Sequence, residues 1–298
     1  VLAEALARRG NNAAADALFR QAVAGDGNLA ELKDLGRDGE NQPWIGRFEN
    51  VACPSCESAP FEPVWVGNIS AYHRCHGLLD PIRLWGRCLT CGLHRVIAPP
   101  PEETLAHWRK ANRSAASIGL PPTASELSQS MAASEPFLDR ILSQGFGDNW
   151  LHRDPIDPGE DSPPRPHLLE IGASWGSFLA AASWRNFVVT GVEGEEERVQ
   201  WIRRRLGANV VQGDRPSDAP LGPYDVVVLH QSLQHSSDPV TLLEEASDLI
   251  EPEGLLALST PSLDHPVHRL LAYDDPGWSD PQRRIWFDRQ ALAVALLR

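Results

Sequence analysis

The stretch HLLEIGASWGSFL, residues 167–179, decides the fold of this chain. Its pattern predicts a short buried strand, a tight turn with two glycines, and the first turn of a helix. A second strand is predicted over residues 187–192, and the carboxylate of Glu193 ends it. A glycine turn after one strand and a carboxylate after the next are typical of a nucleoside pocket at the carboxyl edge of a parallel sheet. The carboxylate suits that place because it accepts two hydrogen bonds from a ribose diol.

The spacing within the turn indicates which nucleoside ligand it suits. The dinucleotide fingerprint is G-x-G-x-x-G, whereas this turn reads E-x-G-x-x-x-G with Ser174 in the middle position. Glu170, two positions before Gly172, would repel a pyrophosphate. A ligand that carries an ammonium group fits this acid better.

Five motifs, in order along about a hundred residues, resemble the class I S-adenosylmethionine-dependent methyltransferases. The glycine turn resembles motif I, and Glu193 ends the second strand as in that family. Residues 209–214, NVVQGD, resemble the third strand with its adenine-side acid. Residues 224–235 resemble the fourth strand and its "hhEH" turn, and residues 238–261 are similar to the "DP…L-x-P-G-G…S-T-P" run. Two residues depart from the family pattern: Ser174 replaces the middle glycine and Gln234 replaces the usual glutamate.

The resemblance implies a site for S-adenosylmethionine along this edge of the sheet. Glu170 and the turn 172–176 would hold the methionine end, Glu193 the ribose, and Asp214 the adenine edge. The alternatives are a plain strand-to-helix turn for the glycines and solvated acids for Glu193 and Asp214. The predicted cofactor-binding residues are Glu170, Gly172, Ala173, Ser174, Gly176, Glu193, Asp214, His230 and Gln231.

A candidate general base follows the fourth strand. His235 lies a few residues past the strand end, and histidine titrates near neutral pH. The alternative is that His235 only braces the turn before Asp238. His230 is closer to the strand, and we expect it to pack against the cofactor.

Two C-x-x-C motifs, CPSC at residues 53–56 and CLTC at residues 88–91, predict a metal site. They are separated by 31 residues, and each places two thiolates on one tight turn. Two such turns supply the four sulfurs of a tetrahedral zinc site. A disulfide pair or a thioredoxin-like motif is the alternative. The predicted Zn²⁺ ligands are Cys53, Cys56, Cys88 and Cys91.

The segment 45–101 around these cysteines resembles the zinc ribbon that precedes the catalytic domain in a subset of these methyltransferases. That subset includes enzymes that methylate deoxysugars attached to nucleotides. His73, Cys75 and His76 lie between the two motifs, and any of them could replace one of the four cysteines. We expect Cys75 to be a spectator.

Residues 1–40 read as a helical hairpin. Gly10, Ala15 and Phe19 are among the residues that fall where a tetratricopeptide repeat places its packing residues. Any amphipathic helical hairpin is the alternative. A repeat could dock a protein partner, and further repeats would then precede Val1, since a single repeat cannot bury its own faces.

The remaining chain is predicted as a connector, 102–165, and a methyltransferase domain, 166–298. The connector has two amphipathic helices, Glu102–Arg113 and Ser125–Gln144, and a proline-rich linker. The domain alternates short Val- and Leu-rich strands with helices, which is typical of an α/β, doubly wound, mainly parallel Rossmann-like sheet. The family's last two strands are missing, so we expect a chain truncated at both ends. Strands are predicted near 168–172, 188–192, 209–212, 225–229 and 254–260, and helices near 176–185, 195–206, 239–250 and after 288.

Length and composition limit the number of domains and the classes of binding partner. A length of 298 residues suggests about two domains. The net charge of −13 argues against binding to bare nucleic acid or to an anionic membrane. No apolar run approaches the roughly 18 residues of a membrane span. We predict a cytoplasmic protein.

The sequence therefore predicts S-adenosylmethionine-dependent methyl transfer to a small-molecule acceptor, with O- or C-methylation of a sugar or sugar nucleotide as the finer prediction. Two other classes stay open. One is a non-catalytic interaction module with a degenerate Rossmann domain, which Ser174 and Gln234 would support. The other is an NAD-dependent oxidoreductase, which the glycine spacing disfavours.

Overall fold

The computed structural model describes residues 51–58, 61–69, 77–80, 82–112, 120–145, 165–271 and 275–298. The predicted hairpin 1–40, the residues His73, Cys75 and His76, and most of the proline-rich linker lie outside the described residues. The chain divides into two compact units, Arg113–Thr260 and Val1–Asn112 with Pro261–Arg298. They are called the parallel-sheet unit and the antiparallel-sheet unit below.

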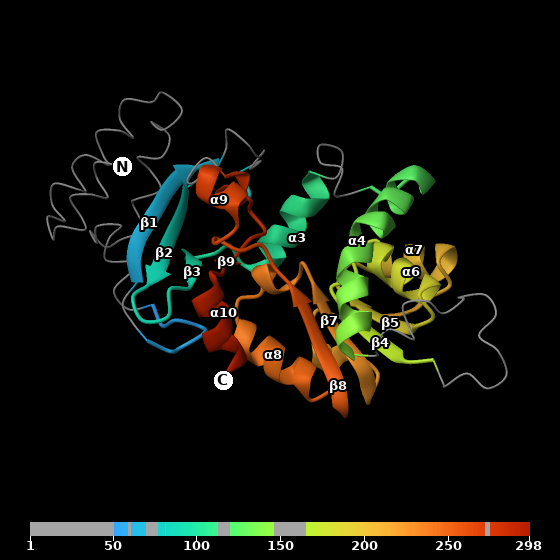
Figure 1. Ribbon diagram of the computed structural model, residues 1–298. Coiled ribbons are helices and arrows are strands. Elements are labelled where there is room, and N and C mark those ends of the chain that lie inside the picture. Colours follow the sequence, from blue (N-terminus) through green and yellow to red (C-terminus); the bar gives the residue numbers. More distant parts are fainter. Residues whose placement is uncertain are drawn as a thin grey trace, which may run out of the picture. The chain divides into compact units, whose positions relative to one another are not determined.

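The parallel-sheet unit contains five parallel strands in the order β6-β5-β4-β7-β8 (Figure 1). This confirms the predicted parallel sheet. Strand β4 is central, with β5 on one side and β7 on the other. The chain thus reverses its direction of winding beside β4, which is where α/β sheets bind ligands at their carboxyl edge. The strands are β4 His167–Ile171, β5 Val188–Glu193, β6 Asn209–Gln212, β7 Tyr224–His230 and β8 Ile250–Ser259.

Helices cover both faces of this sheet, with α4, α6 and α7 on one side and α8 on the other (Figure 1). Helix α8 begins as predicted, because the Asp238 carboxylate accepts the Thr241 N–H at 3.1 Å and a proline follows it. The predicted helix Ser125–Gln144 is confirmed as α4. The helices are α4 Ala124–Gly145, α6 Ser177–Trp184, α7 Glu196–Arg205 and α8 Pro239–Ser247, with short 3-10 turns η4 Pro216–Asp218 and η5 Leu233–His235.

An aliphatic core holds the parallel-sheet unit together. Leu138 and Leu142 of α4 pack with Phe178 of α6, Ile202 of α7 and Val226 of β7, and all five are almost fully buried. Burying such side chains contributes about 1.5–3 kcal/mol each. The core thereby fixes the strand ends that carry the predicted site.

The antiparallel-sheet unit contains four strands in the order β1-β2-β3-β9 (Figure 1). Strand β9 comes from the C-terminal part of the chain and pairs antiparallel with β3, so residues 261–298 group with this unit. The sequence pattern instead predicts these residues as part of the domain 166–298. The elements are β1 Phe61–Asn68, β2 Ile82–Cys88, β3 His94–Ile97, α3 Glu102–Ala111, α9 Pro266–Leu271, η7 Pro276–Trp278, β9 Ile285–Trp286 and α10 Arg289–Leu296.

Tryptophans form the core of this second unit. Trp85 meets Trp278 edge-on, with ring centroids 5.2 Å apart, and its indole N–H donates to the Trp278 carbonyl at 2.9 Å. Trp286 packs against Trp278 at 5.6 Å. The predicted last helix is confirmed as α10, which Asp288 caps by accepting the Ala291 N–H at 2.7 Å. None of the helices in the described part of the chain has the length and apolar character needed to cross a bilayer.

Candidate cofactor site and cysteine cluster

The glycine turn after β4 needs its glycines. Gly172 has φ +81° and Gly176 has φ +74°, a left-handed conformation that L side chains rarely adopt. A Cβ on Gly172 would lie 3.0 Å from the Ser232 Cβ, and one on Gly176 would lie 2.8 Å from the Leu206 Cδ1. Ser174, which replaces the family's middle glycine, also has a positive φ of 51°. Ser174 therefore has a side chain at a position whose backbone conformation favours glycine.

Glu193 at the end of β5 ties the turn to the neighbouring strand. Its carboxylate is 5% exposed and accepts the Ser174 N–H at 2.7 Å, the Glu195 N–H at 3.0 Å and an Arg198 guanidinium N–H at 3.3 Å. Burial raises the pKa of Glu193, while Arg198 and the two N–H groups act against that shift. A carboxylate offers about four acceptor positions. A ribose diol that used both oxygens would therefore displace the longest of these contacts, from Arg198.

Glu170 in β4 is a buried acid with an unsatisfied oxygen. It is 2% exposed, and its Oε2 atom has no hydrogen-bond partner among the residues that the structure describes. Burial and the nearby charge of Glu193 raise the pKa of Glu170 well above its usual value. An unpaired buried acceptor costs about 1–3 kcal/mol. A cationic ligand group beside it would relieve that cost and lower the pKa again.

Ala173 follows β4 and Asp214 follows β6, so both lie at the carboxyl edge of the sheet. Ala173 is buried, and its N–H donates to the Val192 carbonyl at 3.0 Å. Asp214 is exposed and lies close against Gly194, where an added Cβ would collide with its carboxylate. The Asp214 N–H donates to Asp218 at 2.9 Å, which fixes the loop after β6.

His230 ends β7 in a cluster of three rings. Its centroid lies 5.1 Å from Phe137 and 5.1 Å from Phe178. Its Nδ1 atom lies 2.8 Å from the Ser259 hydroxyl, and burial lowers the pKa of His230. Burial therefore disfavours the charged imidazolium, and the Ser259 hydroxyl and the two rings hold the ring in place. Gln231 follows with φ 54°, and its backbone N–H donates to the Ser259 carbonyl at 2.9 Å.

Gln234, the second departure from the family pattern, links the ends of β7 and β8. It is 4% exposed. Its side-chain N–H donates to the Gln231 carbonyl at 2.7 Å, and its Oε1 atom accepts from the Thr260 hydroxyl at 3.2 Å. An ionised glutamate has no proton for the first of these bonds. Sequence reasoning noted the substitution but missed this role, because Thr260, the partner that joins the turn to β8, lies on another segment.

His235 is exposed in the η5 turn, one residue beyond Gln234. Its ring nitrogen Nε2 lies 3.4 Å from the Gln234 side-chain nitrogen, and its backbone N–H donates to the Ser232 carbonyl at 3.0 Å. The structure thus gathers the predicted residues along one sheet edge in two groups. One group surrounds the ends of β4, β5 and β6, and the other the ends of β7 and β8. The close approach of Gly172 and Ser232 joins them.

A family model described as a methyltransferase domain matches residues 150–298. The chain belongs to the methyltransferase domain family. It is similar to the trans-aconitate 2-methyltransferase of Azoarcus sp. strain BH72, with 29% identity over 116 residues that cover 38% of this chain and 46% of the relative. It is also similar to the ubiquinone biosynthesis O-methyltransferase of Caulobacter sp. strain K31, with 28% identity over 100 residues, 31% of this chain and 40% of the relative.

The match thus spans less than half the length of these curated relatives. Among solved structures, the methyltransferase chain is similar to a SAM-dependent methyltransferase of Archaeoglobus fulgidus. The TM-score is 0.43 and the identity 15%, covering 57% of this chain and 67% of that one.

In the antiparallel-sheet unit of this methyltransferase chain, the four predicted cysteines converge. All four Sγ atoms lie within 4.8 Å of one another, with Cys53 and Cys91 at 3.6 Å and Cys56 and Cys88 at 3.6 Å. A disulfide needs about 2.05 Å, so these thiols are not bonded. Four sulfurs around zinc at about 2.3 Å would lie about 3.8 Å apart. The hydrogen bond from Cys91 lowers the pKa of Cys53, which favours a thiolate there.

Sequence reasoning missed a histidine–carboxylate pair in the same unit. Asp275 is 5% exposed, its Oδ1 accepts the Gly277 N–H at 2.8 Å, and its Oδ2 contacts the Nδ1 atom of His268. The His268 ring packs edge-on against Trp286 at 4.8 Å. A carboxylate at Nδ1 orients the ring and leaves Nε2 as the basic nitrogen. No local pattern marks this pair, because a histidine a few residues before an acid is common.

Proposed function

We propose that this methyltransferase domain binds S-adenosylmethionine and transfers its methyl group to a small-molecule acceptor. The observation that carries the proposal is the buried oxygen of Glu170 beneath the glycine turn, which has no hydrogen-bond partner in the described part of the chain. Such an oxygen needs a donor, and a ligand with an ammonium group supplies one. A nicotinamide dinucleotide places a pyrophosphate at the corresponding turn, which a carboxylate repels. The geometry therefore supports the first cofactor over the second.

In this proposal, residues along the sheet edge hold the cofactor from one end to the other. Glu170 and the 172–176 turn would hold the methionine end, Glu193 the ribose and Asp214 the adenine edge. When bound, S-adenosylmethionine supplies an electrophilic methyl group on a sulfonium. The chain's own contribution is to align the acceptor with that group and to exclude water. The ring cluster around His230 supports this role, because it makes the end of β7 apolar and rigid.

We further propose that His235 accepts the acceptor's proton. His235 is exposed to solvent in the η5 turn that follows β7. Gln234 holds the turn that carries it by bonding to both Gln231 and Thr260. The acceptor is a small molecule in this proposal, as the names of the two curated relatives suggest for them. A sugar or sugar nucleotide is the finer proposal, and it rests on the resemblance of residues 45–101 to a zinc ribbon.

The four cysteines fit a structural zinc ion, and we propose that they hold one. Three of them are buried and the fourth, Cys56, is half-buried, so a closed four-sulfur site leaves no open coordination position for chemistry. Zinc would therefore stabilise the fold of this unit. A protein partner for the predicted repeat at residues 1–40 and a cytoplasmic location also remain proposals.

Calorimetry with S-adenosylhomocysteine tests the cofactor proposal. Glu193→Ala removes two charge-assisted hydrogen bonds to the ribose, each contributing about 1.5–3 kcal/mol at most. The affinity should fall at least tenfold. Glu196→Ala is the matched control, because Glu196 is an exposed acid of α7 whose carboxylate bonds to Gln200. Its affinity should stay at the wild-type level.

Three outcomes would contradict the proposal. An unchanged affinity in Glu193→Ala removes that residue from the site. Absence of any binding heat in the wild-type protein favours the interaction module. Heat with NAD⁺ in place of S-adenosylhomocysteine favours the oxidoreductase.

A further inference from the structure

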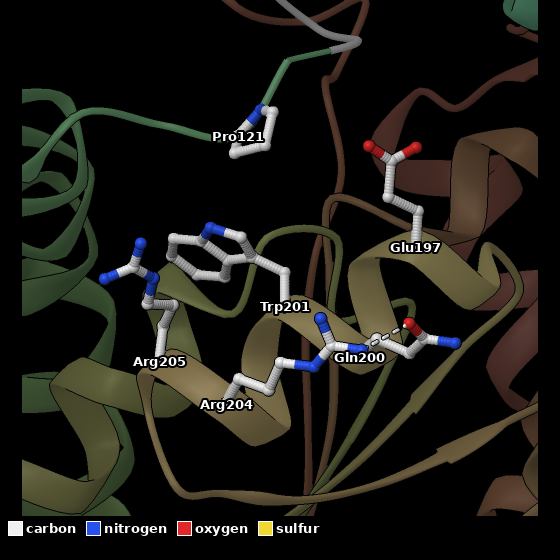
Figure 2. A pocket seen from close by; sticks show the side chains of 6 residues that line it. All are labelled: Pro121, Glu197, Gln200, Trp201, Arg204 and Arg205. Atoms are coloured by element: carbon white, nitrogen blue, oxygen red, sulfur yellow. Dashed lines mark hydrogen bonds between the residues drawn. The ribbon is translucent and has the colours of Figure 1, made fainter.

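A hollow lies beside α7, within the parallel-sheet unit. It has a volume of about 500 Å³. Figure 2 shows the Trp201 indole facing Pro121 across the hollow, with the Arg205 guanidinium at its edge. The lining residues are Pro121, Glu197, Gln200, Trp201, Arg204 and Arg205. None of them belongs to the cofactor site described above.

The side chains that line the hollow favour a ligand that is both planar and negatively charged. Trp201 offers an aromatic face, and Pro121 offers an apolar surface opposite it. The Arg204 guanidinium donates to the Gln200 side chain at 2.9 Å, whereas the Arg205 guanidinium makes no hydrogen bond or ion pair with any residue that the structure describes. Two arginines and one glutamate give the lining a net positive charge in a chain whose net charge is −13. A cluster of this sign attracts anions, and the single carboxylate of Glu197 disfavours highly charged ones.

We propose that this pocket binds a small aromatic carboxylate. The ring lies between Trp201 and Pro121, and the carboxylate pairs with Arg205. Aromatic rings stack well on indole, and a guanidinium forms two parallel hydrogen bonds with a carboxylate. The volume suits a ligand of one or two rings, since small-molecule pockets begin at about 300 Å³.

The pocket is connected to the cofactor turn through a chain of side-chain contacts. Trp201 meets Trp175 edge-on at 5.7 Å, and Trp175 belongs to the glycine turn. The Arg198 guanidinium lies 5.6 Å from the Trp175 ring and also donates to Glu193 at 3.3 Å. A ligand that fixes Trp201 therefore also restrains Trp175 and Arg198, which border the ribose position. This step rests on the proposed cofactor site, and it makes the pocket a place from which cofactor affinity is regulated.

Binding of 2-naphthoate, measured by calorimetry and by saturation-transfer NMR, tests the pocket. The neutral 2-naphthamide serves as its uncharged counterpart. We expect the carboxylate to bind at least tenfold more tightly than the amide. Arg205→Gln should remove that preference, and Trp201→Leu should weaken both ligands at least tenfold. Arg140→Gln and Trp184→Leu are matched controls, because both residues are exposed on other helices, and they should change neither affinity.

Equal affinity for acid and amide, or an unchanged preference in Arg205→Gln, overturns the proposal. Arg205 is a surface residue at the end of α7, so its variant should fold normally and keeps this test decisive. No binding of either ligand also overturns it.

The coupling is tested separately, by measuring S-adenosylhomocysteine affinity with and without saturating 2-naphthoate. We expect a change of at least threefold, and the same factor in the reverse experiment. No change overturns the coupling. If S-adenosylhomocysteine fails to bind while 2-naphthoate binding still depends on Arg205, the pocket stands and the proposed function fails.

Discussion

The two units of this chain hold their folds in different ways. The parallel-sheet unit has a continuous core of Leu, Ile, Val, Phe and Ala side chains between its sheet and helices. In the described part of the antiparallel-sheet unit, the largest core cluster is Trp85, Trp278 and Trp286 with two valines, and four thiols gather in the same unit. A large aliphatic core stabilises a fold by itself, whereas a small one commonly needs a metal. The comparison suggests that burial of apolar side chains stabilises the parallel-sheet unit, whereas metal coordination by the four cysteines stabilises the antiparallel-sheet unit.

Removing the metal should have the largest effect, because it should destabilise the antiparallel-sheet unit and leave the parallel-sheet unit folded. Elemental analysis should give about one zinc per chain. Cys53→Ser or Cys91→Ser should release it and expose the amides of β1, β2 and β3 to hydrogen exchange. Structural zinc contributes roughly 10–16 kcal/mol of apparent folding free energy in zinc-finger peptides, so the loss should be large. The parallel-sheet unit should keep its cooperative unfolding transition.

Cys75→Ser is the control for this experiment. Cys75 is the one cysteine of the sequence outside the two C-x-x-C motifs, and we expect it to be a spectator. Its variant should retain zinc. Zinc content near zero in wild-type protein purified without chelator would refute the metal site, and retention of zinc in Cys53→Ser would refute the ligand set.

The second prediction asks which unit supplies the base. His235 is in the parallel-sheet unit and His268, oriented by Asp275, is in the other. We expect His235→Gln to lower kcat by about 10²–10⁴-fold with cofactor affinity nearly unchanged, since that is the usual loss on removing a general base. The alkaline-going limb of the rate profile should vanish with it. His268→Gln should keep kcat within about threefold of wild type.

The measurement is methyl transfer from labelled S-adenosylmethionine to a small acceptor identified by screening. The reverse result, a loss in His268→Gln alone, would assign the base to the antiparallel-sheet unit. Wild-type turnover in both variants would mean that the enzyme works by alignment of its substrates.

Local patterns predicted most of the parallel-sheet unit. Each strand of this unit is a short apolar run next to a glycine, a proline or an acid, and such signals need no knowledge of distant residues. The structure confirms the five strands and the helix that Asp238 caps. The start of β8 was the least accurate boundary: Ile250 begins the strand, well before the predicted start at residue 254. The run Glu251-Pro252-Glu253 at the start of β8 has the polar, proline-containing pattern of a turn, so the sequence did not predict a strand there.

The antiparallel-sheet unit was only partly predictable. The spacing of the four cysteines predicted their convergence, because each C-x-x-C motif forms one tight turn. The pairing of β9 with β3 was not predicted, since the partners, such as Arg95 and Ile285, lie far apart in the sequence. The same holds for the hydrogen bond from Trp85 to Trp278. Contacts between distant segments leave no periodicity in either segment, which is why the role of Gln234 also escaped prediction.

The third prediction concerns how far the buried Glu170 of the cofactor site lowers the stability of the parallel-sheet unit. Burial and Glu193 raise the pKa of Glu170 in the folded state above its ordinary 4.5. An acid with a raised folded pKa contributes stability below pH 4.5 that is lost as the pH rises through the folded pKa. A folded pKa that exceeds the unfolded pKa by one corresponds to about 1.4 kcal/mol of that stability. Glu170→Gln should therefore make the ligand-free protein more stable at pH 8 and abolish this part of its pH dependence.

Urea unfolding between pH 5 and pH 8, followed on the parallel-sheet transition, measures the effect. Glu196→Gln is the control, because Glu196 is exposed and its substitution should not alter the slope. The Glu170 variant should also bind S-adenosylhomocysteine more weakly. If the stability of Glu170→Gln depends on pH as in the wild type, the Glu170 carboxyl group has a hydrogen-bonding partner in solution and the prediction is wrong.

The smallest expected effect is at Ser174, where the parallel-sheet unit departs from the family glycine. Its φ of 51° costs roughly 1–2 kcal/mol for a residue with a Cβ. Ser174→Gly removes that cost, but the unfolded chain gains about 0.5–1 kcal/mol of conformational freedom. The net gain in stability should therefore be at most about 1.5 kcal/mol, whereas Gly172→Ala, with φ +81° and a 3.0 Å contact to Ser232, should destabilise the unit.

Cofactor affinity decides what Ser174 contributes. Glycine keeps the backbone N–H that donates to Glu193, so affinity for S-adenosylhomocysteine should stay within about threefold of wild type if the backbone alone binds. A tenfold loss would mean that the hydroxyl contacts the ligand, and the substitution would then be functional. Thermal unfolding and calorimetry on the same two variants separate these outcomes. In either case the antiparallel-sheet unit should be unaffected, because the change lies within the aliphatic unit and leaves the four cysteines untouched.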